Sequence, residues 1–315
     1  MANIKICVSH RIDLDSTVIR NDVFLPVYCG ATYKKDGWNK DIIGDNTGDN
    51  ISEKRMSFCE LTVQYWAWKN LEADYYGLCH YRRYLSLRNK KNVYRNEQNQ
   101  IYELTLNKRN KKKYSLDNIE LLREYCKEYD GVIPEPADVR KINSFGKKFK
   151  NVLELWQAHD KYFFDKKVLD ILLNNIKKYR PEYYDYAIEY LNNKKHRGYN
   201  CYILREKYFF ELCRFQYDIL FKIEKELKRN NLIDKYPRTI GYLGEILYGI
   251  FLYYLIKNKV KIKELPLIIF ENTKQNITIK EKIILYSKYN LKRMIKLYLP
   301  NKLQKYLKII YHKMK

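Results

Sequence analysis

The chain has 315 residues, 46% of them hydrophobic, which is typical of a soluble globular protein with one large or two smaller domains. Its formal net charge of +24 predicts an anionic partner, which could be a phosphate-bearing substrate, nucleic acid or an acidic membrane surface. There is no P-loop, no glycine-rich dinucleotide fingerprint and no nucleophile elbow, which argues against those enzyme classes.

The first elements follow an α/β pattern. Apolar runs at 4–9 and 24–29 predict two short strands, and the first ends at His10. The sequence IGDNTGDNIS at 43–52 is rich in glycine, aspartate and asparagine and predicts a loop before a helix. In this loop Asp45, Asp49 and Asn50 are candidates for binding sugar hydroxyls or a metal ion. Asx-turn formation is the structural alternative.

The segment 74–85, DYYGLCHYRRYL, is the most informative part of the sequence. An apolar run at 75–79 predicts a buried strand, and His80, Tyr81, Arg82 and Arg83 follow at its carboxyl end. In open α/β sheets, ligands bind beyond the carboxyl ends of the strands. Because the planar guanidinium matches phosphate oxygens, the two arginines predict a site for a diphosphate, with a solvent-facing strand end as the alternative.

Residues 88–114 interrupt this pattern. They hold nine basic residues against two glutamates, and we expect a basic insertion or lid in place of a core element. Regular structure then resumes with helices and strands that alternate as far as residue 270. The predicted helices are 116–129, 149–158, 165–178, 181–192, a helix from 206 and 239–256, and the predicted strands are 130–133, one within 196–205 and 265–270.

The apolar helix 239–256 contains a candidate catalytic residue. Glu245 lies three positions after Tyr242, and Arg238 precedes the helix by one residue. A glutamate in so apolar a helix needs a cationic or hydroxyl partner or must face a cavity. Burial would raise its pKa toward the range useful for a general base, whereas an ion pair with Arg238 is the structural alternative.

Other polar residues give weaker signals. His10, His80, His159 and His196 lie at the ends of predicted elements, but no pair has the spacing of a metal site. The Asp-x-Asp of Asp13 and Asp15 has the spacing that holds a divalent ion on a nucleotide diphosphate, although it follows the first strand, and turn capping is the alternative.

Several of these segments together resemble a bacterial family. VSH near the N-terminus, IGDNTGDNIS, CELTVQYWAWKN, DYYGLCHYRRYL, the His159 region, NCYIL and RTIGYLGEIL occur in this order in a family first described as a domain of unknown function and found in capsular and exopolysaccharide loci. The resemblance covers about residues 3–270. The members of this family are regarded as glycosyltransferases, some of them galactofuranosyltransferases.

The resemblance implies an α/β fold like that of the A-type glycosyltransferases, a Rossmann-like single domain over 1–271 with extra helices. It also implies transfer of a hexosyl unit, such as galactofuranose, from a nucleoside-diphosphate sugar to a lipid-linked oligosaccharide in capsule, exopolysaccharide or O-antigen synthesis. Dependence on a divalent metal (Mn or Mg) is left open, because HYRR stands where that fold usually has Asp-x-Asp. From the residues and this resemblance together, the catalytic candidates are Glu245 and Asp49, with Asp45 as an alternative base if the reaction inverts configuration. The substrate-binding candidates are His10, Asp45, Asp49, Asn50, His80, Tyr81, Arg82, Arg83, His159, Asn200 and Arg238.

The C-terminal segment 272–315 differs from the rest of the chain. It holds twelve basic residues and a single acid, with apolar residues at helical spacing, and this predicts a basic amphipathic helical tail on an anionic membrane surface. The seven cysteines, none in a Cys-x-x-Cys pair, and the early polar residues favour a cytoplasmic protein, here on the inner face of the cell membrane. The alternative function is nucleic-acid binding without catalysis. With no nucleic-acid motif in the sequence, we do not expect that partner.

Overall fold

The structure is a computed structural model that describes residues 2–34, 39, 41–88, 93–143, 147–232, 234–274 and 278–298. The strands are β1 (Ile4–Arg11), β2 (Phe24–Cys29), β3 (Ile43–Gly44), β4 (Tyr75–His80), β5 (Arg83–Leu85), β6 (Ile101–Thr105), β7 (Gly131–Pro134), β8 (Ala137–Asp138), β9 (Lys195–His196), β10 (Tyr202–Arg205), β11 (Ile262–Leu265) and β12 (Leu267–Asn272). The helices are α1 (Arg55–Phe58), α2 (Leu61–Asn70), α3 (Lys108–Tyr114), α4 (Ile119–Glu128), α5 (Val152–Gln157), α6 (Lys167–Tyr179), α7 (Tyr184–Leu191), α8 (Glu206–Arg229), α9 (Thr239–Lys257) and α10 (Ile279–Tyr298). Short 3₁₀ turns are η1 (Ala31–Tyr33), η2 (Ser52–Lys54), η3 (Val139–Lys141) and η4 (Pro181–Tyr183).

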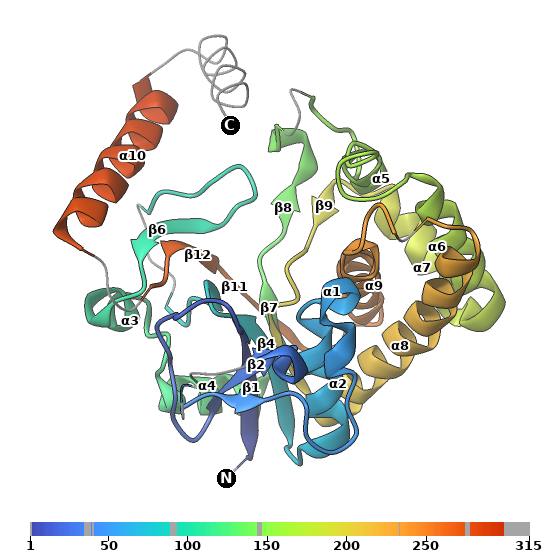
Figure 1. Ribbon diagram of the computed structural model, residues 1–315, viewed down its shortest axis with the longest axis horizontal. Helices are drawn as coiled ribbons and strands as arrows, with labels where there is room; N and C mark the ends of the chain where they lie inside the picture. Colours follow the sequence, from blue (N-terminus) through green and yellow to red (C-terminus); the bar gives the residue numbers. More distant parts are fainter. Residues whose placement is uncertain are drawn as a thin grey trace.

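A mostly parallel sheet forms the centre of the molecule (Figure 1). Its main path runs β11-β7-β10-β4-β1-β2-β3, and β5, β12 and β6 extend it from β4. β1 is parallel to both β2 and β4, whereas β10 is antiparallel to β4 and β7. The expected α/β class with a Rossmann-like sheet is confirmed. The reversed direction of β10 was not predicted, because an isolated apolar strand carries no sign of its direction.

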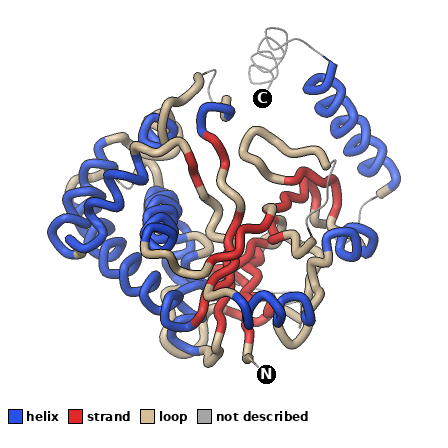
Figure 2. The backbone as a smooth tube through the Cα atoms, turned by 180° about the vertical axis from the view of Figure 1, so that it is seen from behind, coloured by secondary structure: helices blue, strands red, loops and turns tan. Residues whose placement is uncertain are grey.

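Alternation along the central strands sends side chains to two cores, one on each face of the sheet. In β4, Tyr76 and Leu78 point into the larger core, and Tyr75 and Cys79 point into the smaller one. Helices α2, α8 and α9 pack in the larger core, and α4 lies on the other face (Figures 1 and 2). Strands buried on both faces are therefore continuous apolar runs, which explains why the sequence reveals them.

Helix α9 is apolar around its whole circumference because it is a core helix. Within the part of the chain that the structure describes, it is the one helix long and apolar enough to cross a membrane, yet most of it is buried in the protein.

Three local predictions are corrected by the structure. The helix after the 43–52 loop is broken at Cys59, whose φ of 54° separates α1 from α2. The sequence predicts Ser115 as the N-cap of the helix at 116–129, but Ser115 ends α3 in the left-handed region with φ of 52°, and the cap of α4 is the Asn118 side chain, which accepts from the Leu121 amide at 3.0 Å. The last predicted strand is two strands, because Pro266 separates β11 from β12.

The basic segment 88–114 is only in part an excursion from the core. Residues 89–92 lie outside the described residues, but β6 pairs with β12, and Ile101 and Tyr114 are almost completely buried. The lysines made this segment look solvent-exposed in the sequence, because they lie on the outer side of α3 while Tyr114, its last residue, enters the core. The boundary between the domain and the tail at 271–272 stays a prediction.

Candidate active site

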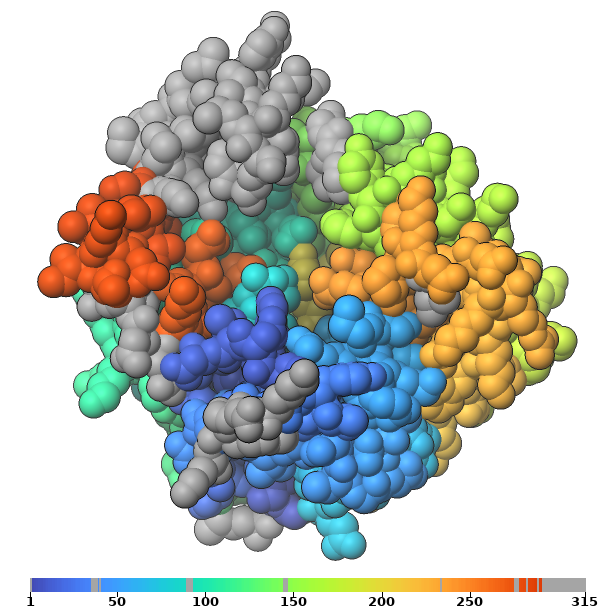
Figure 3. Space-filling model, in the orientation of Figure 1, coloured from blue at the N-terminus to red at the C-terminus, as the bar shows by residue number. Residues whose placement is uncertain are grey.

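The carboxyl ends of β1 and β4 and the amino end of β10 meet at one edge of the sheet. Because β10 is antiparallel, the residues that precede it, among them Asn200, lie beside the residues that follow β4. The start of α9 adds Arg238 and Glu245 to the same edge. Figure 3 shows the surface hollowed here, between segments coloured dark blue, cyan, yellow and orange. The ligand edge of an open α/β sheet thus gathers most of the predicted residues.

Two glutamates form the acidic part of the site. Burial, and after it the nearby Glu60 carboxylate, raise the pKa of Glu245 to about 7, although Arg83 and Arg238 act in the opposite direction. Asn200 donates from Nδ2 to Glu60 Oε1 at 3.1 Å. Asn200 and Tyr199 both have positive φ (37° and 76°), so the chain turns sharply before β10 to present them. With its pKa raised to about 7, Glu245 gains or loses a proton near neutral pH.

Two arginines at the end of β4 form the cationic part. Arg83 opens β5 opposite His80, and its guanidinium lies 4.4 Å from the centre of the Tyr199 ring. The backbone of Arg82 is held in place because its carbonyl oxygen accepts a hydrogen bond from the Phe270 amide at 2.9 Å. Both Nε atoms are buried without a hydrogen-bond partner among the described residues, and burial with the neighbouring Arg83 charge lowers the pKa of Arg82. Two adjacent, partly buried cations favour an anionic ligand.

Arg238 completes the site from the side of α9. Its Nε donates to the Cys59 sulfur at 3.3 Å, and its guanidinium lies 5.5 Å from the centre of the Tyr242 ring. Because Cys59 directly precedes Glu60, this contact fastens the start of α9 to the start of α2. Arg238 is thereby held near both glutamates: its charge acts to lower the pKa of Glu245, and the pKa of Arg238 is raised by Cys59 first and by the charge of Glu60 as well.

The histidines occupy different positions around the site. His10 is fully buried, its Nδ1 lies 2.7 Å from Ser16 Oγ, and its ring centre is 6.4 Å from that of Tyr81. Burial, joined by the charges of Arg83 and Arg82, holds the pKa of His80 well below its ordinary value. Burial also lowers the pKa of His10, to about 4, so both rings favour the neutral form, which suits hydrogen bonding or stacking better than charge neutralisation.

His159 lies farther from the arginines, in an aromatic cluster. Its ring centre is 5.3 Å from Trp156 and 5.0 Å from Phe163, whose ring centre is in turn 5.0 Å from that of Tyr242. Burial lowers its pKa to about 4. Its predicted place in substrate binding is thus at the Tyr242 side of the cleft.

Asp45 is fully buried and has all its partners within the protein. Its carboxylate accepts from the amides of Gly30 and Ala31, both at 2.9 Å, and from the hydroxyls of Ser52 at 2.5 Å and Thr62 at 2.6 Å. These bonds fasten the 43–52 loop to the end of β2, where Gly30 adopts a φ of 73°. The structure thus gives Asp45 a scaffolding function, and its contact with a substrate stays a prediction.

Asp49 and Asn50 lie at the other end of α2 from Glu60. Asp49 accepts from the Tyr65 hydroxyl at 3.2 Å and its amide donates to Asn70 Oδ1 at 3.1 Å. Asn50 bonds only within its own loop among the described contacts. Ten helical residues separate the two ends by about 15 Å. The fold therefore does not bring Asp49 together with Glu245, and Glu245 is the stronger catalytic candidate.

The described residues do not form a metal site made of protein ligands alone. Asp13 bonds to Arg11 and to Arg55 (3.0 Å), so its oxygens already have cationic partners. Within the described ranges, no group of three His, Cys, Asp or Glu side chains gathers as a metal site would require. A divalent ion (Mn or Mg) held mainly by the phosphates of a bound nucleotide needs only one or two protein carboxylates, and this form of metal dependence stays a prediction.

Sequence reasoning missed three contributors to the site. Glu60 lies in the CELT segment, whose charged residue gives no local sign of burial, and Tyr199 supports Arg83 from the turn before β10. Gly198 is the third: a β-carbon there would lie 2.9 Å from His196 Nε2 and 3.5 Å from Glu245 Oε2. Glycine keeps open the space between a histidine and the candidate base.

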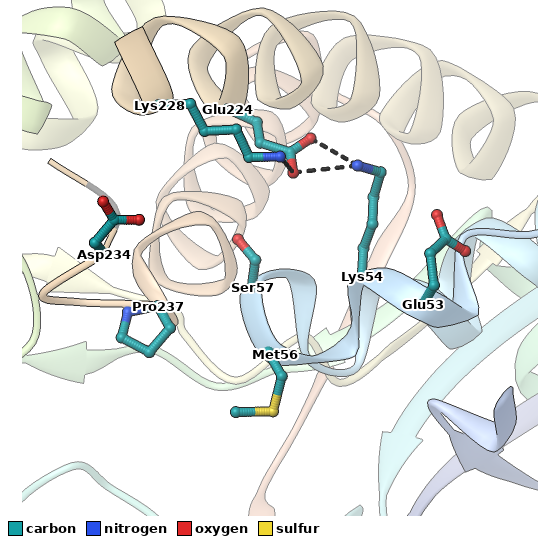
Figure 4. Close-up of a pocket in the computed structure, with 8 residues that line it drawn as sticks. All are labelled: Glu53, Lys54, Met56, Ser57, Glu224, Lys228, Asp234 and Pro237. Atoms are coloured by element: carbon teal, nitrogen blue, oxygen red, sulfur yellow. Dashed lines mark hydrogen bonds and ion pairs between the residues drawn. The ribbon is translucent and has the colours of Figure 1, made fainter. Parts of the chain in front are cut away.

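A cavity of about 480 Å³ lies between η2, α1 and α8 (Figure 4). In it Lys54 and Lys228 both contact the carboxylate of Glu224, at 3.0 and 2.9 Å. It contains none of the predicted site residues, and both of its lysines are already paired with Glu224. This cavity therefore does not compete with the edge of the sheet as the candidate active site.

Comparison with known proteins agrees with the fold. A family model described as "Domain of unknown function (DUF4422)" matches residues 5–259. The apo structure of the WbbM bifunctional glycosyltransferase superposes with a TM-score of 0.75 and 25% identity, over 86% of this chain and 46% of that one. The expected glycosyltransferase-like, Rossmann-like fold is thus confirmed, and the chain spans about half the length of this neighbour. Among proteins of curated function, none matches the chain significantly.

Proposed function

The chain belongs to the family described as a domain of unknown function, DUF4422, and on the chemistry of its site we propose that it is a glycosyltransferase. The observation that carries this proposal is one edge of the sheet where Arg82 and Arg83 follow each other, both with a buried Nε that is unpaired among the described residues, and where Arg83 lies near a glutamate with a pKa of about 7. The likeness to a bifunctional glycosyltransferase supports the same reaction class. That neighbour is bifunctional, and we propose a single glycosyltransferase activity for this chain.

In the proposed reaction, a nucleoside-diphosphate sugar binds with its diphosphate on Arg82 and Arg83. The acceptor hydroxyl oxygen attacks the anomeric carbon, and the bond from that carbon to the diphosphate oxygen breaks. The electron pair leaves with the diphosphate, where the guanidiniums stabilise the developing charge. Glu245 takes the proton of the acceptor hydroxyl, and Asn200 and Glu60 hold the surrounding hydrogen bonds. A single displacement of this kind inverts the anomeric configuration.

The surroundings of Glu245 explain why it works as a base. Burial first, and next the nearby carboxylate of Glu60, disfavour the charged form, so Glu245 keeps its proton until the pH approaches neutrality. Near pH 7, about half of the molecules hold Glu245 as carboxylate, which is the form that accepts a proton. Arg83 and Arg238 prevent the pKa from rising further, and this keeps the base active at neutral pH.

The specific donor and acceptor extend this proposal. We propose a hexosyl donor such as UDP-galactofuranose and a lipid-linked oligosaccharide acceptor in surface polysaccharide synthesis, following the resemblance of the sequence motifs. The arginines at the sheet edge support the diphosphate part of the proposed donor, whereas the choice of sugar follows from the motif resemblance alone.

The test is a thermal-shift screen of the full chain against UDP, GDP, CDP and dTDP, followed by transfer assays with the sugar nucleotides of the carrier that binds. Each assay is run with Mn²⁺, with Mg²⁺ and with a chelator. We expect one diphosphate to stabilise the protein and the matching monophosphate to stabilise it less. Absence of binding by all four diphosphates under every metal condition would reject the proposal. A product that retains the anomeric configuration would reject Glu245 as the base of a single displacement.

A further inference from the structure

Exposed apolar side chains gather at the start of α10. Of the ten large apolar residues that are exposed among the described residues, four lie within two turns of this helix: Ile279, Ile283, Ile284 and Tyr286. Ile279 is 77% exposed and Ile283 is 62% exposed. Figures 1 and 2 show α10 standing at the margin of the molecule, beside β6 and α3. Such a cluster is costly in water and marks an interaction surface.

The helix has a second face that packs on the protein. Glu281, Leu285 and Tyr289 recur every four residues and are partly buried, and the Tyr289 ring stacks on Tyr102 with centroids 5.8 Å apart. Ile279, Ile283 and Tyr286, at i, i+4 and i+7, occupy the face that points away. The outward apolar face is thus left over after α10 has docked on β6.

The charges around this outward face are basic. The one acid in residues 272–315 is Glu281, and it is engaged on the inner side: its amide bonds to Thr278 Oγ1 at 3.2 Å, its carboxylate accepts from the Thr278 amide at 2.9 Å, and Lys274 lies 3.7 Å away. Lys280, by contrast, is exposed between the isoleucines. Helix α3, which lies on the same side of the molecule, has the sequence KRNKKKY.

We propose that α10 docks on an anionic lipid surface, with Ile279, Ile283 and Tyr286 buried at the headgroup level. Aliphatic side chains flanked by lysines match a leaflet, where apolar burial and charge attraction act together. Nucleic acid would be contacted through cations and stacked aromatics and gives no reason for a row of isoleucines. This surface is separate from the active site, so the inference does not depend on the reaction proposed above.

The chain connects this surface to the site. The amide of Phe270 donates to the carbonyl of Arg82, and β12 continues from there to within seven residues of α10. A membrane bound by α10 therefore lies on the side of the molecule where β12 leaves the sheet edge. An acceptor held in that membrane would approach the site from this side.

Flotation with vesicles tests this proposal without any activity measurement. The full chain is mixed with vesicles of phosphatidylglycerol and phosphatidylethanolamine, or of phosphatidylcholine alone, at 0.15 M salt, an ionic strength near the physiological one. The test variant is Ile279→Gln/Ile283→Gln, which keeps helix propensity and removes the apolar face. The matched control is Met56→Gln/Ile256→Gln, which removes two exposed apolar side chains elsewhere. Thermal unfolding of each variant checks that the fold is unchanged.

We expect the full chain and the control to bind anionic vesicles, and the α10 variant to bind at least tenfold more weakly. Binding to phosphatidylcholine should be weaker for every variant. Equal binding by the α10 variant and the control, or no binding of the full chain to anionic vesicles, would overturn the proposal. Binding to duplex DNA that both competes with the vesicles and survives the α10 substitutions would assign the basic surface to nucleic acid instead.

Discussion

The substitution Glu245→Gln separates a catalytic glutamate from a structural one, because the two functions predict opposite changes in stability. In the folded protein the pKa of Glu245 is raised from 4.5 to about 7, mainly by burial and next by Glu60. Between these pH values the folded state binds one proton more than the unfolded state. The free energy of unfolding therefore falls as the pH rises through this window.

The size of this effect follows from the same numbers. At about 1.4 kcal/mol for each pH unit, the interval from 4.5 to about 7 corresponds to at most roughly 3.5 kcal/mol. Glutamine has the same shape and carries no charge, so Glu245→Gln should be more stable than the natural protein at pH 8, by up to about 3.5 kcal/mol. At pH 4.5 the two proteins should differ little. A rise of several degrees in Tm at pH 8 would be visible by differential scanning fluorimetry.

Activity should change in the opposite direction. Loss of a general base lowers kcat by about 10²- to 10⁴-fold, and nucleoside-diphosphate binding should persist. For the natural protein, kcat/KM should rise about tenfold for each pH unit below 7 and level off above it, since the carboxylate is the active form. The matched control is Glu224→Gln, which leaves Lys54 and Lys228 without their shared carboxylate and should lower stability. If Glu245→Gln also lowers stability at pH 8, the glutamate is a structural ion-pair partner and the reasoning is wrong.

Three further substitutions test the surroundings of the site. Arg83→Ala should weaken nucleoside-diphosphate binding at least tenfold in a calorimetric titration, since a charge-assisted contact contributes about 1.5 to 3 kcal/mol; Arg205→Ala, which also removes an arginine from a tyrosine ring but at the far end of β10, should not weaken it. Asp45→Ala should cost at least about 3 kcal/mol in urea unfolding, because four buried donors lose their acceptor, and a loss below 1 kcal/mol would contradict its scaffolding function. Gly198→Ala should reduce turnover more than Tm, because the added methyl group enters the space beside Glu245; full activity would show that this space is not used.

The sequence alone predicted the elements that carry their own pattern. Buried strands such as β1 and β4 are continuous apolar runs, and the polar residues after β4 mark its carboxyl end. The positive charge of the tail and the helical spacing of its apolar residues could also be predicted from the sequence, because they are local properties. The sequence predicted an insertion or lid where β6 joins the sheet, because nearby lysines outnumber the few apolar positions of that segment.

Only the tertiary structure decided which polar residues meet. Asp45 and Asp49 are four residues apart in one loop, yet one is fastened inside the protein and the other lies beyond the far end of α2. Glu60 and Glu245 are distant in sequence and become neighbours because α9 packs against α1 and α2 begins beside it. Such meetings depend on strand direction, helix packing and the breaks between elements, which arise from many long-range contacts together. A local pattern specifies an element, and the packing of all elements specifies a site.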